Sequence, residues 1–161
     1  MESISYDIVG SVDLDELTSF YDRQGHRAPS SREKLERMVS GSFCVVTARR
    51  GGDLIGIARA VTDGVNGYLT ECKLDPRFQG PAAVTRMEGR IEHDQEGIAK
   101  EMACRVIDEL RGAGVERVHV LGYGTEADFC EELGFKKIGG MVALYLDLSA
   151  GAPVASPAGV R

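Results

Sequence analysis

The 161-residue sequence lacks the features that mark several large classes of protein. It contains no apolar run of roughly 18 residues, so no segment is long enough to cross a bilayer as a helix. Its first residues, MESISYDIVG, lack the basic and hydrophobic regions of a signal peptide. It also lacks a surplus of basic charge, because the net charge is -6 and the pI is near 5.1, which argues against a nucleic-acid binder. These absences favour a soluble, cytoplasmic protein.

Cysteine pairs with metal-site spacing are also missing. Cys44, Cys72, Cys104 and Cys130 are far apart and form no C-x-x-C motif, so we expect reduced, buried thiols and no bound metal. With 43% hydrophobic residues, the chain has enough apolar material for the core of one domain. We expect this single domain over residues 1–149, and a disordered tail over 150–161, which is rich in Gly, Ala and Pro.

Six segments show the alternation or the short apolar runs that are typical of strands. Two connections between them, 51–53 and 63–67, consist largely of Gly, Asn and Asp residues that tolerate the positive φ of tight turns. They therefore join three consecutive strands into an antiparallel meander. The expected strands cover residues 4–9, 43–48, 54–61, 68–74, 117–121 and 141–148.

Helices are expected between these strands. Two capping boxes start the first two helices, and they are formed by Asp13 with Glu16 and by Ser30 with Glu33. From Gly97 onward, apolar residues recur every three or four positions, which predicts a long helix that ends near Gly112, and a short helix follows over 126–133. This order predicts an α+β fold, an α/β/α sandwich with a mixed, mostly antiparallel sheet flanked by helices.

Four segments carry a resemblance to the GNAT superfamily of N-acetyltransferases over roughly residues 4–148. They are LIGIARAVTDG at 54–64, LDPRFQG at 74–80, GIA at 97–99 and FCEELGF at 129–135. The resemblance implies an N-acyltransferase that moves an acetyl or other short acyl group from acyl-CoA to a primary amine by direct attack in a ternary complex. The acceptor would be a small molecule or a protein amine. A homodimer is compatible with the resemblance, whereas membrane and nucleic-acid partners are not expected.

The family's cofactor loop is interrupted in this sequence by residues 81–96. In the family, the strand before the loop pairs with the pantetheine arm, and the following helix start binds the pyrophosphate through its amides and dipole. One interpretation takes Gln79-Gly80 and Gly97-Ile98-Ala99 as the two halves, with an extra amphipathic helix in the insertion. A second takes Arg86-x-x-Gly89 as the phosphate loop, which puts Gly97 inside the long helix at a cost of about 1 kcal/mol. We prefer the first.

The first interpretation and the resemblance together imply a set of cofactor-binding residues. They are Cys72, Lys73, Leu74, Gln79, Gly80, Glu96, Gly97, Ile98, Ala99, Lys100 and Phe129. The inserted segment itself is either a tolerated surface excursion or a device that caps the cofactor, shapes the acceptor pocket or contacts another subunit.

The acid that protonates the departing thiolate is the second departure from the family. GNAT enzymes commonly place a Tyr directly after the Phe of the last helix, and here Cys130 occupies that position. A thiol can donate a proton, but a buried Cys is often inert packing. Tyr123, in the preceding loop, is an alternative donor.

Candidates for the base are Glu71, in the central strand, and His93 and His119. Regular alternation puts Glu71 on the face opposite Tyr68 and Leu74, whereas the family's strand bases usually share the face of the Leu74 position. A water chain would need no dedicated base. Because the usual Tyr is absent and the loop is interrupted, a degenerate member that binds acyl-CoA or a protein without transfer is the alternative. Another is an acyltransferase that assembles with a protein target through the insertion.

Overall fold

A computed structural model of the chain describes residues 2–24, 29, 31–79, 94, 96–122 and 126–149. These residues form one five-stranded sheet in the order β1-β2-β3-β4-β5, in which β4 and β5 are parallel and the other neighbours are antiparallel. The strands are β1 (Ile4–Ile8), β2 (Cys44–Arg50), β3 (Asp53–Thr62), β4 (Asn66–Leu74) and β5 (Arg117–Val120). The helices are α1 (Leu14–Arg23), α2 (Arg32–Ser40), α3 (Ile98–Gly112) and α4 (Ala127–Glu132), and a short 3-10 helix, η1 (Pro76–Phe78), follows β4.

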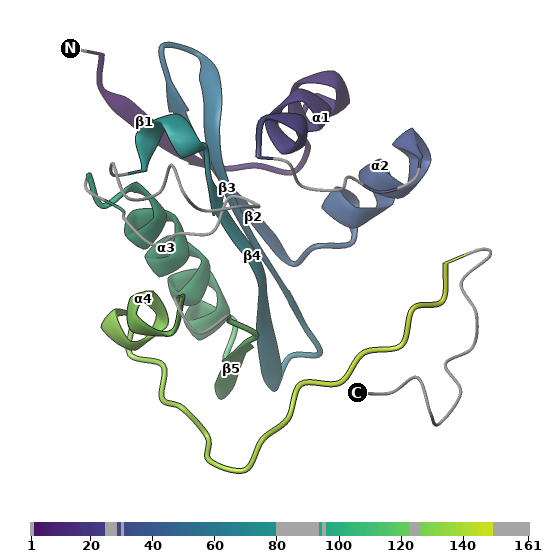
Figure 1. The fold of residues 1–161 in the computed structure, drawn as a ribbon, viewed down its shortest axis with the longest axis vertical. Helices are drawn as coiled ribbons and strands as arrows, with labels where there is room; N and C mark the ends of the chain where they lie inside the picture. The colour runs from purple at the N-terminus through teal and green to yellow at the C-terminus, as the bar shows by residue number, and fades with distance from the viewer. Residues whose placement is uncertain are drawn as a thin grey trace.

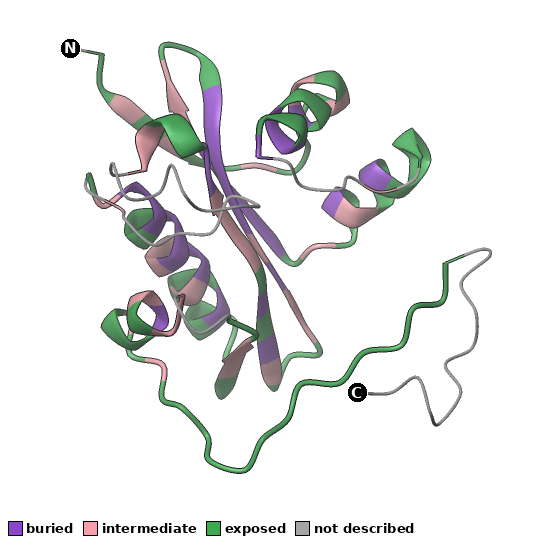
Figure 2. Cartoon of the chain, in the orientation of Figure 1, coloured by how far each residue is buried: buried purple, intermediate pink, exposed green. Residues whose placement is uncertain are grey.

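Helices cover both faces of the sheet, with α1 and α2 on one side and α3 and α4 on the other (Figure 1). Each side has its own apolar cluster, and Figure 2 shows the buried residues along the sheet and the inward sides of the helices. A side chain at Gly56 in β3 would come within 2.7 Å of Met102 in α3, so this helix packs directly on the backbone of the sheet. The predicted α/β/α sandwich is confirmed. None of the helices in the described ranges is long and apolar enough to span a membrane.

The predicted caps are right for α1 and displaced by one residue for α2. Asp13 Oδ1 accepts a hydrogen bond from the Glu16 amide at 2.9 Å. For α2, the N-cap is Ser31, whose hydroxyl accepts from the Lys34 amide at 3.2 Å, and not Ser30, which lies outside the described residues. Two adjacent serines offer the same capping chemistry, so the sequence pattern did not separate them.

A bulge in β4 changes which of its residues share a face. Arg59 pairs with Glu71 but Ala60 pairs with Leu69, so Thr70 is the extra residue, and its hydroxyl donates to the Arg59 carbonyl at 3.0 Å. Leu69 and Leu74 belong to the cluster under α3, and Tyr68, next to Leu69, lies on the opposite face with Glu71. The expectation that Tyr68 shares the face of Leu74 is therefore wrong, because it assumed unbroken alternation.

The predicted last strand is also wrong. Residues 141–148 form no strand, and the large apolar side chains among them are 62% to 94% exposed. After α4 the chain runs as an extended trace away from the sheet (Figure 1). Alternation in a sequence favours an extended backbone, but a strand also needs a hydrogen-bonded neighbour, and within the described residues this segment has none. The predicted tail over 150–161 and most of the insertion, at 81–93 and 95, lie outside the described residues.

Candidate functional site

β4 pairs with β5 along only part of its length. Asn66 to Leu69 pair with Arg117 to Val120, and beyond that point the residues of β4 from Thr70 to Leu74 have β3 as their only neighbouring strand within the described ranges. The separation starts at the bulge, where a strand bends. The segment from Cys72 to Leu74 therefore presents an open strand edge, which is the kind of edge that an extended ligand with amide groups can pair with.

The start of α3 lies beside this edge. Gly97 is the N-cap residue with φ 69°, and α3 begins at Ile98. The Cys72 thiol donates to the Ala99 carbonyl at 3.4 Å, which joins β4 to the first turn of the helix. This start contradicts the second interpretation of the loop, which required Gly97 to lie inside the helix. A left-handed N-cap suits glycine because other residues pay a steric penalty there.

Asp94 occupies the amides at the start of α3. Its Oδ1 accepts from the Ile98 amide at 2.7 Å and its Oδ2 accepts from the Lys100 amide at 2.9 Å. The positive end of the helix dipole favours an anion here. The position therefore favours an anion, and a carboxylate of the chain itself holds these donors. Asp94 is not among the residues predicted from the sequence, although an Asp shortly before a helix start is a recognisable capping signal.

Arg50, at the end of β2, contacts residues near both ends of the insertion. Its Nη2 donates to both carboxylate oxygens of Glu96 at 2.9 Å, and its guanidinium lies 4.8 Å from the centre of the Phe78 ring. Phe78 lies shortly before the insertion, and Glu96 is its last residue. Glu96, predicted to bind the cofactor, is thus engaged with Arg50, and Arg50 contacts the chain both before the insertion and at its end.

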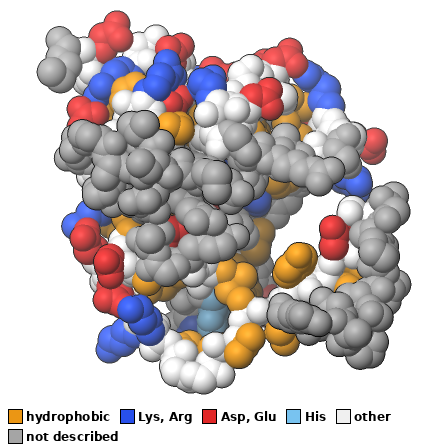
Figure 3. All heavy atoms as spheres, in the orientation of Figure 1, with side chains coloured by type: hydrophobic (Ala, Val, Ile, Leu, Met, Phe, Trp, Pro, Cys, Tyr) orange, Lys and Arg blue, Asp and Glu red, His pale blue; other side chains and the backbone are white. Residues whose placement is uncertain are grey.

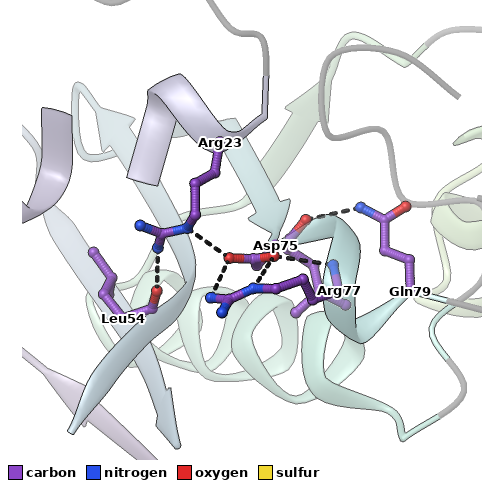
Figure 4. A network of polar contacts seen from close by, with 6 residues as sticks. Arg23, Leu54, Asp75, Arg77 and Gln79 are labelled. Carbon is purple, nitrogen blue, oxygen red and sulfur yellow. Dashed lines mark hydrogen bonds and ion pairs between the residues drawn. The ribbon is translucent and has the colours of Figure 1, made fainter. Parts of the chain in front are cut away.

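A buried carboxylate fixes the turn after β4 (Figure 4). Asp75 is 1% exposed and accepts from Arg23 Nε at 2.8 Å and from Arg77 Nη2 at 2.8 Å. Arg23 also donates to the Leu54 carbonyl at 2.9 Å, so the network ties α1 to β3. Burial alone would raise the pKa of Asp75, but the bonds from Arg77 and Arg23 outweigh it and hold that pKa below its ordinary value.

Gln79 completes this turn, because its side-chain amide donates to the Leu74 carbonyl at 2.8 Å (Figure 4). The predicted cofactor residue Gln79 therefore shapes the strand end in the structure. Its neighbour Gly80 lies outside the described residues, as do Tyr123 and His93.

The four cysteines are free thiols; Cys44 and Cys130 are buried, and Cys72 and Cys104 are half-buried. Cys130, on α4, lies beside the chain that follows β5, since a Cβ on Gly122 would be 3.7 Å from its sulfur. Burial is the main cause of the raised pKa of the Cys72 thiol, and a negative charge on Cys130 would raise that pKa further. Burial, and then the charge of Glu126, raise the pKa of the Cys130 thiol. It is therefore protonated at neutral pH. Phe129, the residue before it, packs against the cluster under α3.

Polar side chains gather on the opposite face of β4. Tyr21 Oη donates to Glu71 Oε1 at 2.6 Å, and Arg59 forms an ion pair with Glu71 at 3.4 Å. Burial, and then the negative charge of Glu71, raise the pKa of Tyr21. Further along the strands, Tyr68 stacks on His119 of β5 with ring centres 5.2 Å apart. This face therefore carries two of the predicted base candidates, Glu71 and His119, each with partners of its own.

No protein-family model and no curated protein matches the sequence. Among solved structures, the chain is similar to a GNAT-family acetyltransferase from Streptococcus pneumoniae TIGR4, with TM-score 0.65, 17% identity, and coverage of 90% of this chain and 100% of that one. An aminoglycoside acetyltransferase from an uncultured soil metagenomic sample, in complex with sisomicin, gives TM-score 0.65, 15% identity and coverage of 91% and 97%. The aminoglycoside N-acetyltransferase AAC(6')-Iy in complex with CoA gives TM-score 0.66 and 16% identity, with coverage of 92% of this chain and 97% of that one. The chain therefore has the fold of the GNAT superfamily of N-acetyltransferases.

Proposed function

We propose that this protein is an acyl-CoA-dependent N-acyltransferase that transfers an acetyl or other short acyl group to a primary amine. The open edge of β4 beside the start of α3 is the observation that carries the proposal. A strand edge suits an extended arm that contains amides, and a helix start suits a diphosphate, so the two features together match acyl-CoA. A structure of the same fold in complex with CoA supports this choice of ligand.

The proposed cofactor residues then take different roles. The backbone of Cys72, Lys73 and Leu74 would pair with the pantetheine arm, and the amides from Gly97 to Lys100 would receive the pyrophosphate after Asp94 withdraws. Gln79 and Glu96 would act indirectly, by fixing the two sides of the loop. Phe129 would line the site from α4.

The reaction needs positioned substrates more than covalent help from the protein. The amine nitrogen attacks the thioester carbonyl carbon, the C–N bond forms and the C–S bond breaks. The amine loses a proton to a base or to water, and the CoA thiolate leaves and takes up a proton. Because the pKa of Cys130 is raised, full proton transfer from it to an ordinary thiolate would be uphill. We therefore give Cys130 a hydrogen bond to the leaving sulfur, and Tyr123 stays the alternative acid.

The acceptor would approach from the face that carries Glu71. Tyr21 and Arg59 hold the Glu71 carboxylate in one orientation, which suits a group that receives the amine proton directly or through a water. The net charge of -6 favours a cationic acceptor. A neighbour of the same fold binds sisomicin, an aminoglycoside, which supports including such amines among the candidates.

Calorimetry with acetyl-CoA, followed by thiol release with a panel of primary amines that includes an aminoglycoside, tests the proposal. We expect saturable binding, and thiol release that depends on an amine. No binding at millimolar acetyl-CoA would refute it. Binding without release from any amine would instead favour the alternative, a module that holds acyl-CoA without transfer, for which the replacement of the usual Tyr by the buried Cys130 is the supporting observation.

A matched pair of glycine variants tests the placement of the pyrophosphate. Gly97, at the start of α3, has φ 69°, and Gly114, past its end, has φ 81°, and added Cβ atoms would meet nothing within 4 Å at either position. Gly97→Val and Gly114→Val should therefore each lose about 1–2 kcal/mol of stability. Only Gly97→Val should weaken acetyl-CoA binding, and equal affinities in the two variants would place the pyrophosphate elsewhere.

A further inference from the structure

Arg59 and Glu71 form a charged pair across two neighbouring strands. Arg59 in β3 pairs with Glu71 in β4, and its Nε lies 3.4 Å from Glu71 Oε2. Both side chains are largely buried, at 14% and 9% exposed. Tyr68, the next residue on this face of β4, is 49% exposed, so the pair lies at the margin of the buried region. The described residues therefore leave the pair within reach of a ligand on the Tyr68 side.

The guanidinium of Arg59 is only loosely held. Its Nη1 donates to the Ser42 hydroxyl at 3.4 Å, and its buried Nε has no hydrogen-bond partner among the residues that the structure describes. Hydrogen bonds from nitrogen to oxygen are ordinarily about 2.7–3.2 Å long. A buried cation with unsatisfied donors is costly, so a residue that only holds the fold together would have better partners. The unpaired Nε therefore points to a ligand group that accepts hydrogen bonds.

Arg49, in β2, shows how a nearby arginine is held when its partner belongs to the fold. Its Nη1 and Nη2 donate to the two carboxylate oxygens of Glu16 in α1 at 2.8 and 2.5 Å, and Nη1 also donates to the Gly52 carbonyl at 2.8 Å. This bidentate geometry is the strong form of an arginine–carboxylate pair. Arg59 also has a carboxylate beside it but lacks this geometry, which favours a second anionic partner for Arg59.

The charges at this position favour an acceptor that carries both signs. Tyr21 donates to Glu71 at 2.6 Å, and burial and the charge of Glu71 raise the pKa of Tyr21 more than Arg59 lowers it, so Tyr21 is uncharged at neutral pH. One negative and one positive group then lie side by side. Glu71 attracts the ammonium of an acceptor, but a second positive group nearby would be repelled by Arg59. An anionic group there would instead pair with the guanidinium fork.

The overall charge of the chain does not decide between these acceptors. The net charge is -6, but on the face seen in Figure 3 the acidic and basic side chains of the described residues are interspersed. Salt screens the attraction between exposed charges beyond about 10 Å at about 0.1 M, whereas Arg59 would act in direct contact. This contact therefore selects among the amines that reach the site.

We propose that Arg59 binds an anionic group of the acceptor, so that the acceptor is a primary amine with a carboxylate or a phosphate close to its nitrogen. This assignment rests on the proposed function, in which Glu71 faces the acceptor amine. Because Arg59 and Glu71 are 3.4 Å apart, only a short spacer joins the amine to the anion, as in an α-amino acid or in O-phosphoethanolamine. Arg59 is then the residue that sets the specificity for the acceptor.

Matched amines test this preference without acyl transfer. Calorimetry in the presence of CoA, which has no acyl group to donate, compares phenylalanine with phenethylamine and O-phosphoethanolamine with ethanolamine, so the two pairs separate a carboxylate from a phosphate. At least one anionic amine should bind about 10- to 100-fold more tightly than its counterpart without the anion, as expected for hydrogen bonds between charged groups. Equal or tighter binding of both counterparts, or no binding of either anionic amine, would overturn the proposal.

Variants separate binding of the anion from support of Glu71. Arg59→Gln should bind both members of the preferred pair with similar affinity, and the control Arg49→Gln should keep the preference. Arg59→Lys, the milder change, keeps the charge without the fork and should lower the preference about 3- to 10-fold, which decides the matter if circular dichroism shows that Arg59→Gln does not fold. If the Arg59 variants weaken both members by the same factor, Arg59 only positions Glu71 and the proposal is wrong.

The same amines distinguish this proposal from acyl transfer itself. Absence of acetyl-CoA binding would refute acyl transfer, and the matched titrations, repeated without CoA, would still measure the preference for an anion. Thiol release from acetyl-CoA that is faster with phenethylamine and ethanolamine than with both anionic amines would support acyl transfer but refute the role of Arg59. We expect the reverse order, and we expect Arg59→Gln to abolish it.

Discussion

Asp94→Ala should change stability and cofactor affinity in opposite directions. The carboxylate bonds the Ile98 and Lys100 amides at 2.7 and 2.9 Å, so it caps α3. Loss of a side-chain cap costs about 0.5–2 kcal/mol, and because Asp94 makes two bonds we expect a loss of about 1–2 kcal/mol in urea unfolding. If the pyrophosphate uses these amides, acyl-CoA must displace Asp94. The variant omits that step, so acetyl-CoA affinity should rise by about 1–2 kcal/mol, which is roughly 5- to 30-fold.

The control is Asp108→Ala, which removes the same charge near the other end of α3, from an exposed pair with Arg111. It should change neither property by more than about 0.5 kcal/mol. Isothermal calorimetry of both variants and the unmodified chain at one ionic strength measures the affinities. A less stable Asp94→Ala protein with unchanged or weaker acetyl-CoA binding would show that Asp94 is only a cap and that the phosphates lie away from these amides.

Asp75→Asn should lower the free energy of unfolding by about 2–3 kcal/mol, since Asp75 is buried but both its arginines are partly exposed. The pKa of Asp75 is lowered in the folded protein, so its contribution to stability is lost as the pH falls. Urea unfolding at several pH values should therefore show the full difference between variant and unmodified protein above about pH 4, and a smaller difference below it. Arg50→Gln should weaken acetyl-CoA binding about 3- to 10-fold in calorimetry while costing less than about 1 kcal/mol of stability, because its contacts with Phe78 and Glu96 align the loop at the surface. If Glu71 is the base, steady-state assays of Glu71→Gln should show kcat lower by about 100-fold at unchanged acetyl-CoA affinity. If activity falls only as much as the fraction of folded protein falls, Glu71 serves instead to anchor α1 through Tyr21. Cys130→Ser should retain kcat within about threefold across pH, because a hydroxyl can replace a hydrogen bond to sulfur; a larger loss would make Cys130 the acid.

The sequence predicts the elements well where one local signal decides them. Asp13 caps α1 with its own side chain, and the apolar stripe of α3 packs as its period of 3.6 requires, with Met102 and Val106 fully buried. In both cases the information lies within a few residues. The glycine at the start of α3 was also predictable, because only Gly97 in that region tolerates a left-handed backbone.

The features that define the site depend on neighbours that are distant in sequence. The bulge at Thr70 arises from the register between β3 and β4, so alternation in β4 alone put Tyr68 on the wrong face. The Asp75 network joins residues from α1 and η1, and Arg50 bridges β2 to both ends of an insertion. No pattern in one segment shows these contacts. The segment 141–148 is the opposite case, because its sequence alternates as a strand does but no strand among the described residues pairs with it.

The bulge at Thr70 sets both the position and the two sides of the candidate site. Pairing between β4 and β5 ends at Leu69 with Val120, and the open edge begins with Thr70. The extra residue also changes the alternation of β4, so that Glu71 meets Tyr21 and Arg59 on one face while Cys72 meets the first turn of α3 on the other. A single irregularity in register would therefore leave the strand edge open for acyl-CoA and place a carboxylate on the face proposed for the acceptor.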